Sequence, residues 1–318
     1  MTRRAVLAAA AVVLAAGGAR AQQATEPVAA LAMPAVRQFG TARVMGLDAA
    51  YVGIAEGAAA LQWNPAGLGM LASPEAGWHH AIGLGGTTGE TLIVGVPVGR
   101  LGGLAAAADY VDNGSMESRD EVGNLTGHYG AGTVSAALGW GTSVADGLYV
   151  GAAARAVRQT LAELTYTAVC ADAGVLWRLN AIPGLSVGAA AANLGSSGSG
   201  SSLASSIRAG ASLVRNLGGV NRVLAAVAAD IEPGGLQRVD FGVEDTIYSR
   251  LALRAGYRVN LSGQQLTGLA GLTAGLGVTF GAFALDYAYL PFGDLGTSHR
   301  VGLTYRGRGT GAEWGGSR

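Results

Sequence analysis

Residues with obvious catalytic or metal-binding chemistry are few in this chain. His79 and His80 form the only adjacent histidine pair, and because successive strand residues point to opposite faces, the pair is not expected to bind one metal ion. The glycine-rich run 83–89 lacks the lysine that follows a phosphate-binding loop. No Gly-x-Ser-x-Gly sequence marks a nucleophile elbow. We therefore expect neither an enzyme nor a metal or cofactor site.

Charges that alternate with apolar residues are better candidates for a functional site. Residues 238–244 and 250–258 each place charged side chains on one face and Val, Phe, Leu or Tyr on the other. A strand aligns such charges, whereas a helix would scatter them around its circumference. We expect the charged faces to line the lumen of a barrel. The candidate lumen residues are Arg155, Asp240, Glu244, Arg250, Arg254 and Arg258.

These lumen charges have two interpretations. If the two segments pair about a turn centred near residue 247, Glu244 faces Arg250 and Asp240 faces Arg254. Opposite charges across a ladder contribute about 0.2–1 kcal/mol each, so the pairs could serve only to stabilise the wall. In the functional interpretation, a basic lining contacts a lipid with a carboxylate or another polar head. That lining would consist of Arg155, Arg250, Arg254 and Arg258.

The composition narrows the class of protein. Hydrophobic residues make up 50% and charged residues 13% of 318, with 53 Gly, which is too apolar for an ordinary soluble domain and too glycine-rich for a helical core. A formal net charge of zero gives no reason to expect nucleic acid as a partner. A soluble secreted β-protein is a further alternative, but its outward Leu, Phe and Tyr would form large apolar patches that soluble monomers avoid.

The chain begins with the features of a secretory leader. Arg3 and Arg4 precede the apolar stretch 5–16, and an Ala-x-Ala site follows, which predicts cleavage near Ala21. We expect residues 1–21 to be a signal peptide.

Past residue 75, about ten alternating residues followed by turn residues form a recurring unit, the signature of a transmembrane barrel. We predict about 14 strands and expect the longer connections, 112–130, 195–202 and 291–296, at the outer side. The uncharged stretch 261–285 could span a membrane as a helix, but its six glycines favour two strands. The predicted strands begin near 75, 89, 100, 131, 147, 165, 184, 203, 222, 236, 249, 269, 282 and 298.

Residues 40–69 form a glycine- and alanine-rich string that ends in Trp-Asn-Pro-Ala-Gly-Leu-Gly. The string resembles the N-terminal plug signature of FadL-type outer-membrane barrels, in particular their PorV/PorQ-like branch. The matching residues are Gly40, Ala42, Arg43, Met45, Gly46, Ala50, Tyr51, Val52, Ala55, Glu56 and Trp63 to Leu68. The residues chosen as the plug motif are Gly46, Tyr51, Glu56, Trp63, Asn64, Pro65, Ala66 and Gly67.

The resemblance and the alternation together predict an all-β fold, a transmembrane antiparallel β-barrel in the bacterial outer membrane. The expected parts are the leader, a plug segment at 22–74, the barrel at 75–306 and a polar tail at 307–318. The resemblance implies a plugged conduit or binding site for hydrophobic small molecules. Its alternative is a non-transporting, PorV-like partner of a secretion system that acts as a cargo shuttle or scaffold. The expected partners are outer-membrane lipid and either a hydrophobic ligand or secretion-system proteins.

Overall fold

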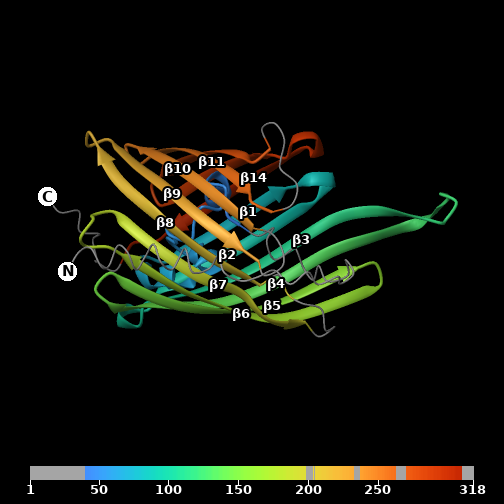
Figure 1. Cartoon of the computed structure of the whole chain (residues 1–318), viewed down its shortest axis with the longest axis horizontal. Coiled ribbons are helices and arrows are strands. Elements are labelled where there is room, and N and C mark those ends of the chain that lie inside the picture. Colours follow the sequence, from blue (N-terminus) through green and yellow to red (C-terminus); the bar gives the residue numbers. More distant parts are fainter. Residues whose placement is uncertain (1–39, 198–202, 204, 233–236, 263–269, 310–318) are drawn as a thin grey trace.

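The computed structural model describes residues 40–197, 203, 205–232, 237–262 and 270–309. In this part of the chain, fourteen antiparallel strands close into one barrel, each paired with the next and β1 with β14 (Figure 1). The predicted fold class and strand number are confirmed. The strands are β1 Glu75–Ile82, β2 Thr88–Pro97, β3 Gly103–Arg119, β4 Leu125–Ala145, β5 Leu148–Leu161, β6 Leu164–Arg178, β7 Leu185–Ser197, β8 Ser206–Leu217, β9 Asn221–Ile231, β10 Gln237–Ile247, β11 Leu251–Asn260, β12 Leu272–Phe280, β13 Phe283–Pro291 and β14 Thr297–Arg306.

Short helical turns complete the described elements. Three 3-10 turns lie in connections between strands: η5 Leu84–Gly86, η6 Gly99–Leu101 and η7 Gly293–Leu295. In the described residues, no helix combines the length and the apolar character needed to cross a membrane. The stretch 261–285 contains β12 and the start of β13, while its residues 263–269, like the predicted leader 1–21, lie outside the described residues.

The predicted long connection 112–130 is wrong, because most of it is strand. β3 and β4 pair almost to their tips and reach well beyond the neighbouring strands (Figure 1). The sequence Asp112-Asn-Gly-Ser115 looks like a turn, but it forms an irregularity in the ladder instead, with Gly114 at φ +74°. Such a bulge absorbs the extra residues while pairing continues on both sides.

The predicted pairing of β10 with β11 is also wrong. The turn is centred on Ser249, so Glu244 faces Arg254 and Asp240 faces Arg258. Tyr248 and Ser249 both adopt positive φ, at +50° and +54°, and Ile247 extends the ladder by pairing with Leu251. The sequence offers no glycine here to signal left-handed backbone, which is why the turn was placed too early.

The predicted alternation of faces is confirmed. In β2, Leu92 and Val94 point outward and are about half exposed, whereas Ile93 points inward and is buried. In β11, Leu253 points outward and Arg254 is buried in the lumen. Outward apolar side chains suit a hydrocarbon environment, and the closed sheet leaves no unpaired edge there.

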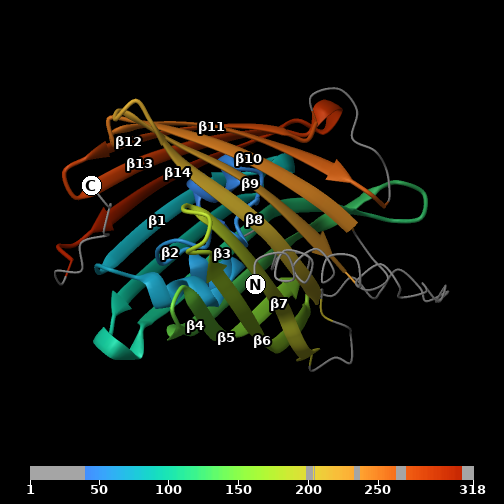
Figure 2. The ribbon, with the colours of Figure 1, turned by 60° about the vertical axis from the view of Figure 1, so that its left-hand side comes forward.

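Residues 40–71, the inner segment, lie inside the barrel and are largely buried (Figure 2). The segment contains α2 Ala42–Gly46, α3 Ala60–Trp63 and the 3-10 turn η4 Pro65–Met70. Thr41 caps α2 by accepting a hydrogen bond from the Val44 amide. Asn64 caps η4, and its side chain also donates to the carbonyl oxygens of Val52 and Val175, at 3.0 Å each.

A row of wall glycines explains how the Asn-Pro-Ala-Gly sequence fits against the barrel. Gly103, Gly141, Gly151 and Gly174 lie side by side across β3 to β6 and form the glycine row. A Cβ atom at Gly151 would lie 2.3 Å from the backbone of Pro65, and one at Gly174 would lie 2.0 Å from Asn64 Oδ1. Only glycine permits so close an approach of two backbones.

The glycine row generates a test. We expect Gly151→Val to force the inner segment away from the wall and to lower the unfolding free energy by about 1–3 kcal/mol, as overpacking of a core does. The matched control is Ala152→Val, because Ala152 is the next residue of β5 and is exposed on the outer face. The measurement is the thermal unfolding of both purified variants in detergent. Equal melting temperatures would contradict the close contact at Gly151.

Candidate functional site in the lumen

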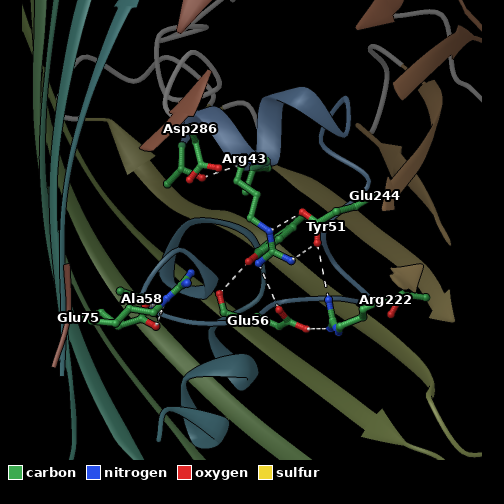
Figure 3. Close-up of polar contacts among 12 residues, drawn as sticks. Arg43, Tyr51, Glu56, Ala58, Glu75, Arg222, Glu244 and Asp286 are labelled. Atoms are coloured by element: carbon green, nitrogen blue, oxygen red, sulfur yellow. Dashed lines mark hydrogen bonds and ion pairs between the residues drawn. The ribbon is translucent and has the colours of Figure 1, made fainter. Parts of the chain in front are cut away.

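Arg43 of α2 lies at the centre of an ion network between the inner segment and the barrel wall (Figure 3). Its Nε and Nη2 atoms donate to the two carboxylate oxygens of Glu244 on β10, at 2.9 Å each. Its Nη1 atom lies 3.2 Å from Glu56, and Glu56 in turn lies 3.1 Å from Arg222 on β9. The network therefore joins two parts of the inner segment to two adjacent strands.

The wall continues this network around the barrel. Arg254 on β11 donates to Glu244 at 2.6 Å and to Asp286 on β13 at 2.7 Å. Glu244 is only 2% exposed, so its charge depends on its arginine partners, which are Arg43, Arg254 and, at 3.7 Å, Arg222. Bidentate contacts between guanidinium and carboxylate are strong because both hydrogen bonds align at once.

Two charges of the inner segment, those of Arg43 and Glu56, are held in their ionised forms. Burial works against the charge of Arg43, but the carboxylates of Glu244 and Glu56 raise its pKa well above the ordinary value. Burial likewise works against the charge of Glu56, yet Arg43 and Arg222 hold its pKa below the ordinary value. The pairs compensate for the loss of water around each charge.

A second network lies next to the first on β8 to β11. Asp48 of the inner segment accepts a hydrogen bond from Arg258 at 2.5 Å, and Arg258 also lies 3.5 Å from Asp240. Burial raises the pKa of Asp48 to about 7, with Arg258 opposing and Asp240 adding to this shift. Further pairs extend the network: Arg238 with Asp240 and Asp230, and Arg208 with Asp230.

Of the predicted lumen residues, two groups come together in these networks and two residues lie elsewhere. Glu244 and Arg254 belong to the first network, and Asp240 and Arg258 to the second. Arg155 lies apart on β5, buried and 3.7 Å from Asp172. Arg250 differs from expectation: it lies in the connection between β10 and β11 and is exposed.

The predicted basic lining is therefore replaced by paired charges. Arg155, Arg254 and Arg258 each lie against at least one carboxylate. These arginines give the lumen no excess of positive charge, because their partners are acidic side chains of the wall or of the inner segment.

The predicted plug-motif residues all lie in the inner segment and are at least partly buried. The Tyr51 hydroxyl donates to the backbone oxygen of Glu56 at 2.8 Å, and the Arg43 guanidinium lies 5.9 Å from the Tyr51 ring centroid.

The other plug-motif residues pack against the barrel wall. The Trp63 ring lies 5.2 Å from the guanidinium of Arg208. Gly46 packs against Gly275 of β12. Pro65, Ala66 and Gly67 are buried near the glycine row, each within η4.

Sequence reasoning missed most of the partners of these residues. The sequence pattern does not single out Arg222, Asp286 or Asp48, and it marks Arg43 only through the family resemblance. Asp109 on β3 was also missed; it accepts hydrogen bonds from Gln62, Thr91 and Ser135. One signal was present: Arg43, Asp48 and Glu56 are the only charged residues in 40–71, and charges in so apolar a segment need partners.

A cavity of about 540 Å³ lies beside the first network. It lies near the end of the barrel where β1 begins at Glu75 and β14 ends at Arg306, which we call the terminus end. The inner segment forms one side of the cavity, and the wall strands β1, β2 and β9 to β14 form the other. Glu75 also accepts a hydrogen bond from the Ala58 amide at 2.9 Å, which fastens the inner segment at this end.

His79 and His80 point to opposite faces, as expected. His79 is buried in the lumen and lines the cavity, whereas His80 lies on the outer face, where it contacts Trp78 and Glu90. In the part of the chain that the structure describes, no group of three or more metal-binding side chains is found.

No protein-family model and no curated protein sequence matches this chain. Solved structures do match. The toluene transporter TodX of Pseudomonas putida aligns with TM-score 0.55 at 15% identity, over 79% of this chain and 93% of that chain. The Ralstonia pickettii toluene transporter TbuX aligns with TM-score 0.56 at 13% identity, over 85% and 98%. A Pseudomonas aeruginosa FadL homologue gives 0.53 at 12% identity, over 84% and 98%. The chain therefore has the fold of FadL-type outer-membrane barrels.

The first network predicts a large effect of removing Arg43. Arg43→Met removes the bidentate partner of buried Glu244 and leaves it with Arg254 and the more distant Arg222, and we expect the unfolding free energy to fall by about 2–5 kcal/mol. The control is Arg119→Met, which removes an exposed pair with Glu117 at the tip of β3 and should change little. Denaturant unfolding of both variants, followed by tryptophan fluorescence, makes the comparison. Similar losses in both variants would refute the importance of the buried pair.

The second network predicts a pH dependence. Because the pKa of Asp48 rises from 3.8 to about 7 on folding, the folded protein keeps a proton that the unfolded chain releases in this interval. The stability that Asp48 contributes is therefore greatest below pH 4 and is lost as the pH rises to 7.

The variant Asp48→Asn removes this titration and retains a residue type that tolerates φ +48°. Melting temperatures of wild type and variant are measured from pH 5 to pH 8. The melting temperature of the wild type should fall relative to that of the variant as the pH rises. If the melting temperature of the wild type instead rose relative to that of the variant with rising pH, the raised pKa of Asp48 would be disproved.

Proposed function

We propose that this protein is a plugged conduit for hydrophobic small molecules in the bacterial outer membrane, with the inner segment as the plug. The observation that carries the proposal is a FadL-type barrel whose lumen holds a folded segment, fastened differently on its two sides. The solved structures with this fold include toluene transporters, which supports a hydrophobic cargo. The terminus end would face the periplasm, because both ends of the barrel sequence lie there.

The two sides of the plug suggest which part moves. Residues 64–71, the row-bound part, pack on the glycine row with backbone contacts that tolerate no added atom. Residues 42–56, the ion-paired part, also lie close to wall glycines, with Gly242 and Gly256 against the backbone of Leu47 and Asp48. In addition, this part contacts β9 to β11 through charged side chains and adjoins the cavity. Side-chain ion pairs can exchange partners or accept water, and the cavity gives the ion-paired part a space to move into, whereas the row-bound part cannot leave the glycine row without opening a void. Opening would therefore involve the ion-paired part.

Three finer assignments remain proposals. The domain limits are a signal peptide at 1–21, a plug at 22–74 and a tail at 307–318, and the PorV/PorQ-like branch is the proposed subfamily. The non-transporting secretion partner stays an alternative prediction. No contact in the described residues favours it over the conduit.

The test is a pair of reversible tethers in a Cys170→Ser background, which removes the native thiol. A Cβ atom at Gly242 would lie 3.0 Å from Leu47 Cβ, so Leu47→Cys/Gly242→Cys can bridge the ion-paired part to β10. A Cβ atom at Gly95 would lie 3.0 Å from Ala58 Cβ, so Ala58→Cys/Gly95→Cys bridges the inner segment to β2 outside the ion-paired part and serves as the matched control.

Uptake would be measured with a toluene-responsive intracellular reporter in a host without a toluene channel of its own. We expect the oxidised Leu47–Gly242 tether to abolish uptake and reduction to restore it, while the Ala58–Gly95 tether leaves uptake unchanged. If the untethered protein gives no uptake above the empty host, the conduit is wrong. If both tethers leave uptake intact, the conduit stands and the moving part is wrong.

A further inference from the structure

The cavity beside Arg43 has an amphipathic lining. Its apolar side chains, Met70, Leu71 and Ile93, come from the end of the inner segment and from β2. Its charged side chains come mainly from the opposite direction, where Arg43 and Glu56 meet strands β9 to β13 (Figure 3). An apolar wall with a few polar groups at one side is the usual composition of a small-molecule site, and about 540 Å³ is within the usual size range.

The barrel wall leaves this space open because its inward residues are small. Across the ladder from β10 to β14, Thr246 faces Ala252, and Thr279 faces Ala284, which in turn faces Thr304. The hydroxyl groups of Thr246, Thr279 and Thr304 make no hydrogen bond within the described part of the chain, and all three residues line the cavity. Each hydroxyl can therefore donate to or accept from a bound molecule.

The charges of the lining balance. Four arginines are matched by four carboxylates, so the cavity attracts neither an anion nor a cation by net charge. The arginines are Arg43, Arg222, Arg254 and Arg306, and the carboxylates are Glu56, Glu75, Glu244 and Asp286. A carboxylate ligand would meet as many acidic groups as basic ones, and its own desolvation would be uncompensated.

A plain hydrocarbon also fits this lining poorly. The side chains of Arg222 and Glu56 are 35% and 26% exposed, so both retain contact with water. A hydrocarbon that filled the cavity would remove this water and leave the three threonine hydroxyls without partners, which costs free energy. A neutral molecule with one hydroxyl group on an apolar body avoids both costs.

We propose that this cavity is a binding site for neutral hydroxylated hydrocarbons, such as aromatic alcohols, in preference to unsubstituted hydrocarbons and to carboxylates. The apolar body lies against Met70, Leu71 and Ile93, and the hydroxyl group bonds to a hydroxyl group of Thr246, Thr279 or Thr304. The proposal rests on the proposed function, since it names the class of molecule that the conduit would hold near its terminus end.

The experiment is fluorine NMR binding to the purified full-length protein in detergent, with three probes of similar size. The probes are 4-fluorobenzyl alcohol, 4-fluorotoluene and 4-fluorobenzoate, each compared at equal free aqueous concentration against a detergent blank. We expect the alcohol to bind at least ten-fold more tightly than the other two. Tighter or equal binding of the toluene or the benzoate overturns the proposal, as does a lack of alcohol binding.

Two sets of variants locate the binding. Ala284→Trp fills the cavity and should abolish binding of the alcohol, whereas Leu285→Trp, at the next and outward-facing residue of β13, should not. The near-isosteric double variant Thr279→Val/Thr304→Val should weaken the alcohol several-fold and leave the toluene probe unchanged. Alcohol binding that resists both Ala284→Trp and the valine pair overturns the site.

The binding assay and the uptake assay can fail independently. Toluene uptake with preferred binding of the toluene probe would keep the conduit and reject the ligand class. Selective alcohol binding without uptake of any probe would keep the site and reject the conduit.

Discussion

The charge pairing between the inner segment and the wall is the constraint on which the lumen depends. Arg43, Asp48 and Glu56 are the only charges in residues 40–71, and each lies against an opposite charge on β9 to β11. A buried charge without a partner costs several kcal/mol or is neutralised. The segment can occupy the lumen with these residues only because the wall supplies their partners in matching positions.

The inner segment meets the opposite side of the barrel by a different kind of contact, and the difference shapes the cavity. On β3 to β6, glycines admit the backbone of 64–68 directly and leave no free space. On β10 to β12, glycines also meet the backbone of residues 46–48 closely. Beside the cavity, however, the inward residues of β10 to β14 are small, and the inner segment reaches the wall there through long arginine and glutamate side chains. Long side chains span a gap that the backbone does not fill, and the cavity lies in that gap. Small wall residues thus allow close backbone packing where the inner segment reaches the wall, and they leave a cavity where only its long side chains reach the wall.

The sequence predicted the wall far better than the lumen, for a physical reason. Strand pairing follows a period of two that lipid on one face enforces in every strand, so the fourteen strands and most of their starts could be read locally. The errors lie where the local code is ambiguous: a turn-like sequence that forms a bulge at Gly114, and a turn without glycine at Tyr248 and Ser249. Arg43 and Glu244 lie 201 residues apart, and no periodicity connects them. The only local indication was the rule that buried charges need partners, which predicts opposite charges on the wall for the three charges of residues 40–71.

The outward and inward faces of the strands are subject to different physical constraints. A shared fold therefore gives little information about which molecule the lumen binds. Outward residues must be apolar wherever hydrocarbon surrounds the barrel, so they resemble one another in any member of the fold. Inward residues meet only the inner segment and whatever enters the lumen, so they are free to differ. At 12–15% identity, the toluene transporters and the FadL homologue share the fold of the barrel with this chain, and the likeness shows the fold alone. The lining must be interpreted from its own side chains, and its balanced charges, together with threonine hydroxyls that have no partner among the described residues, are the basis for proposing a ligand more polar than toluene.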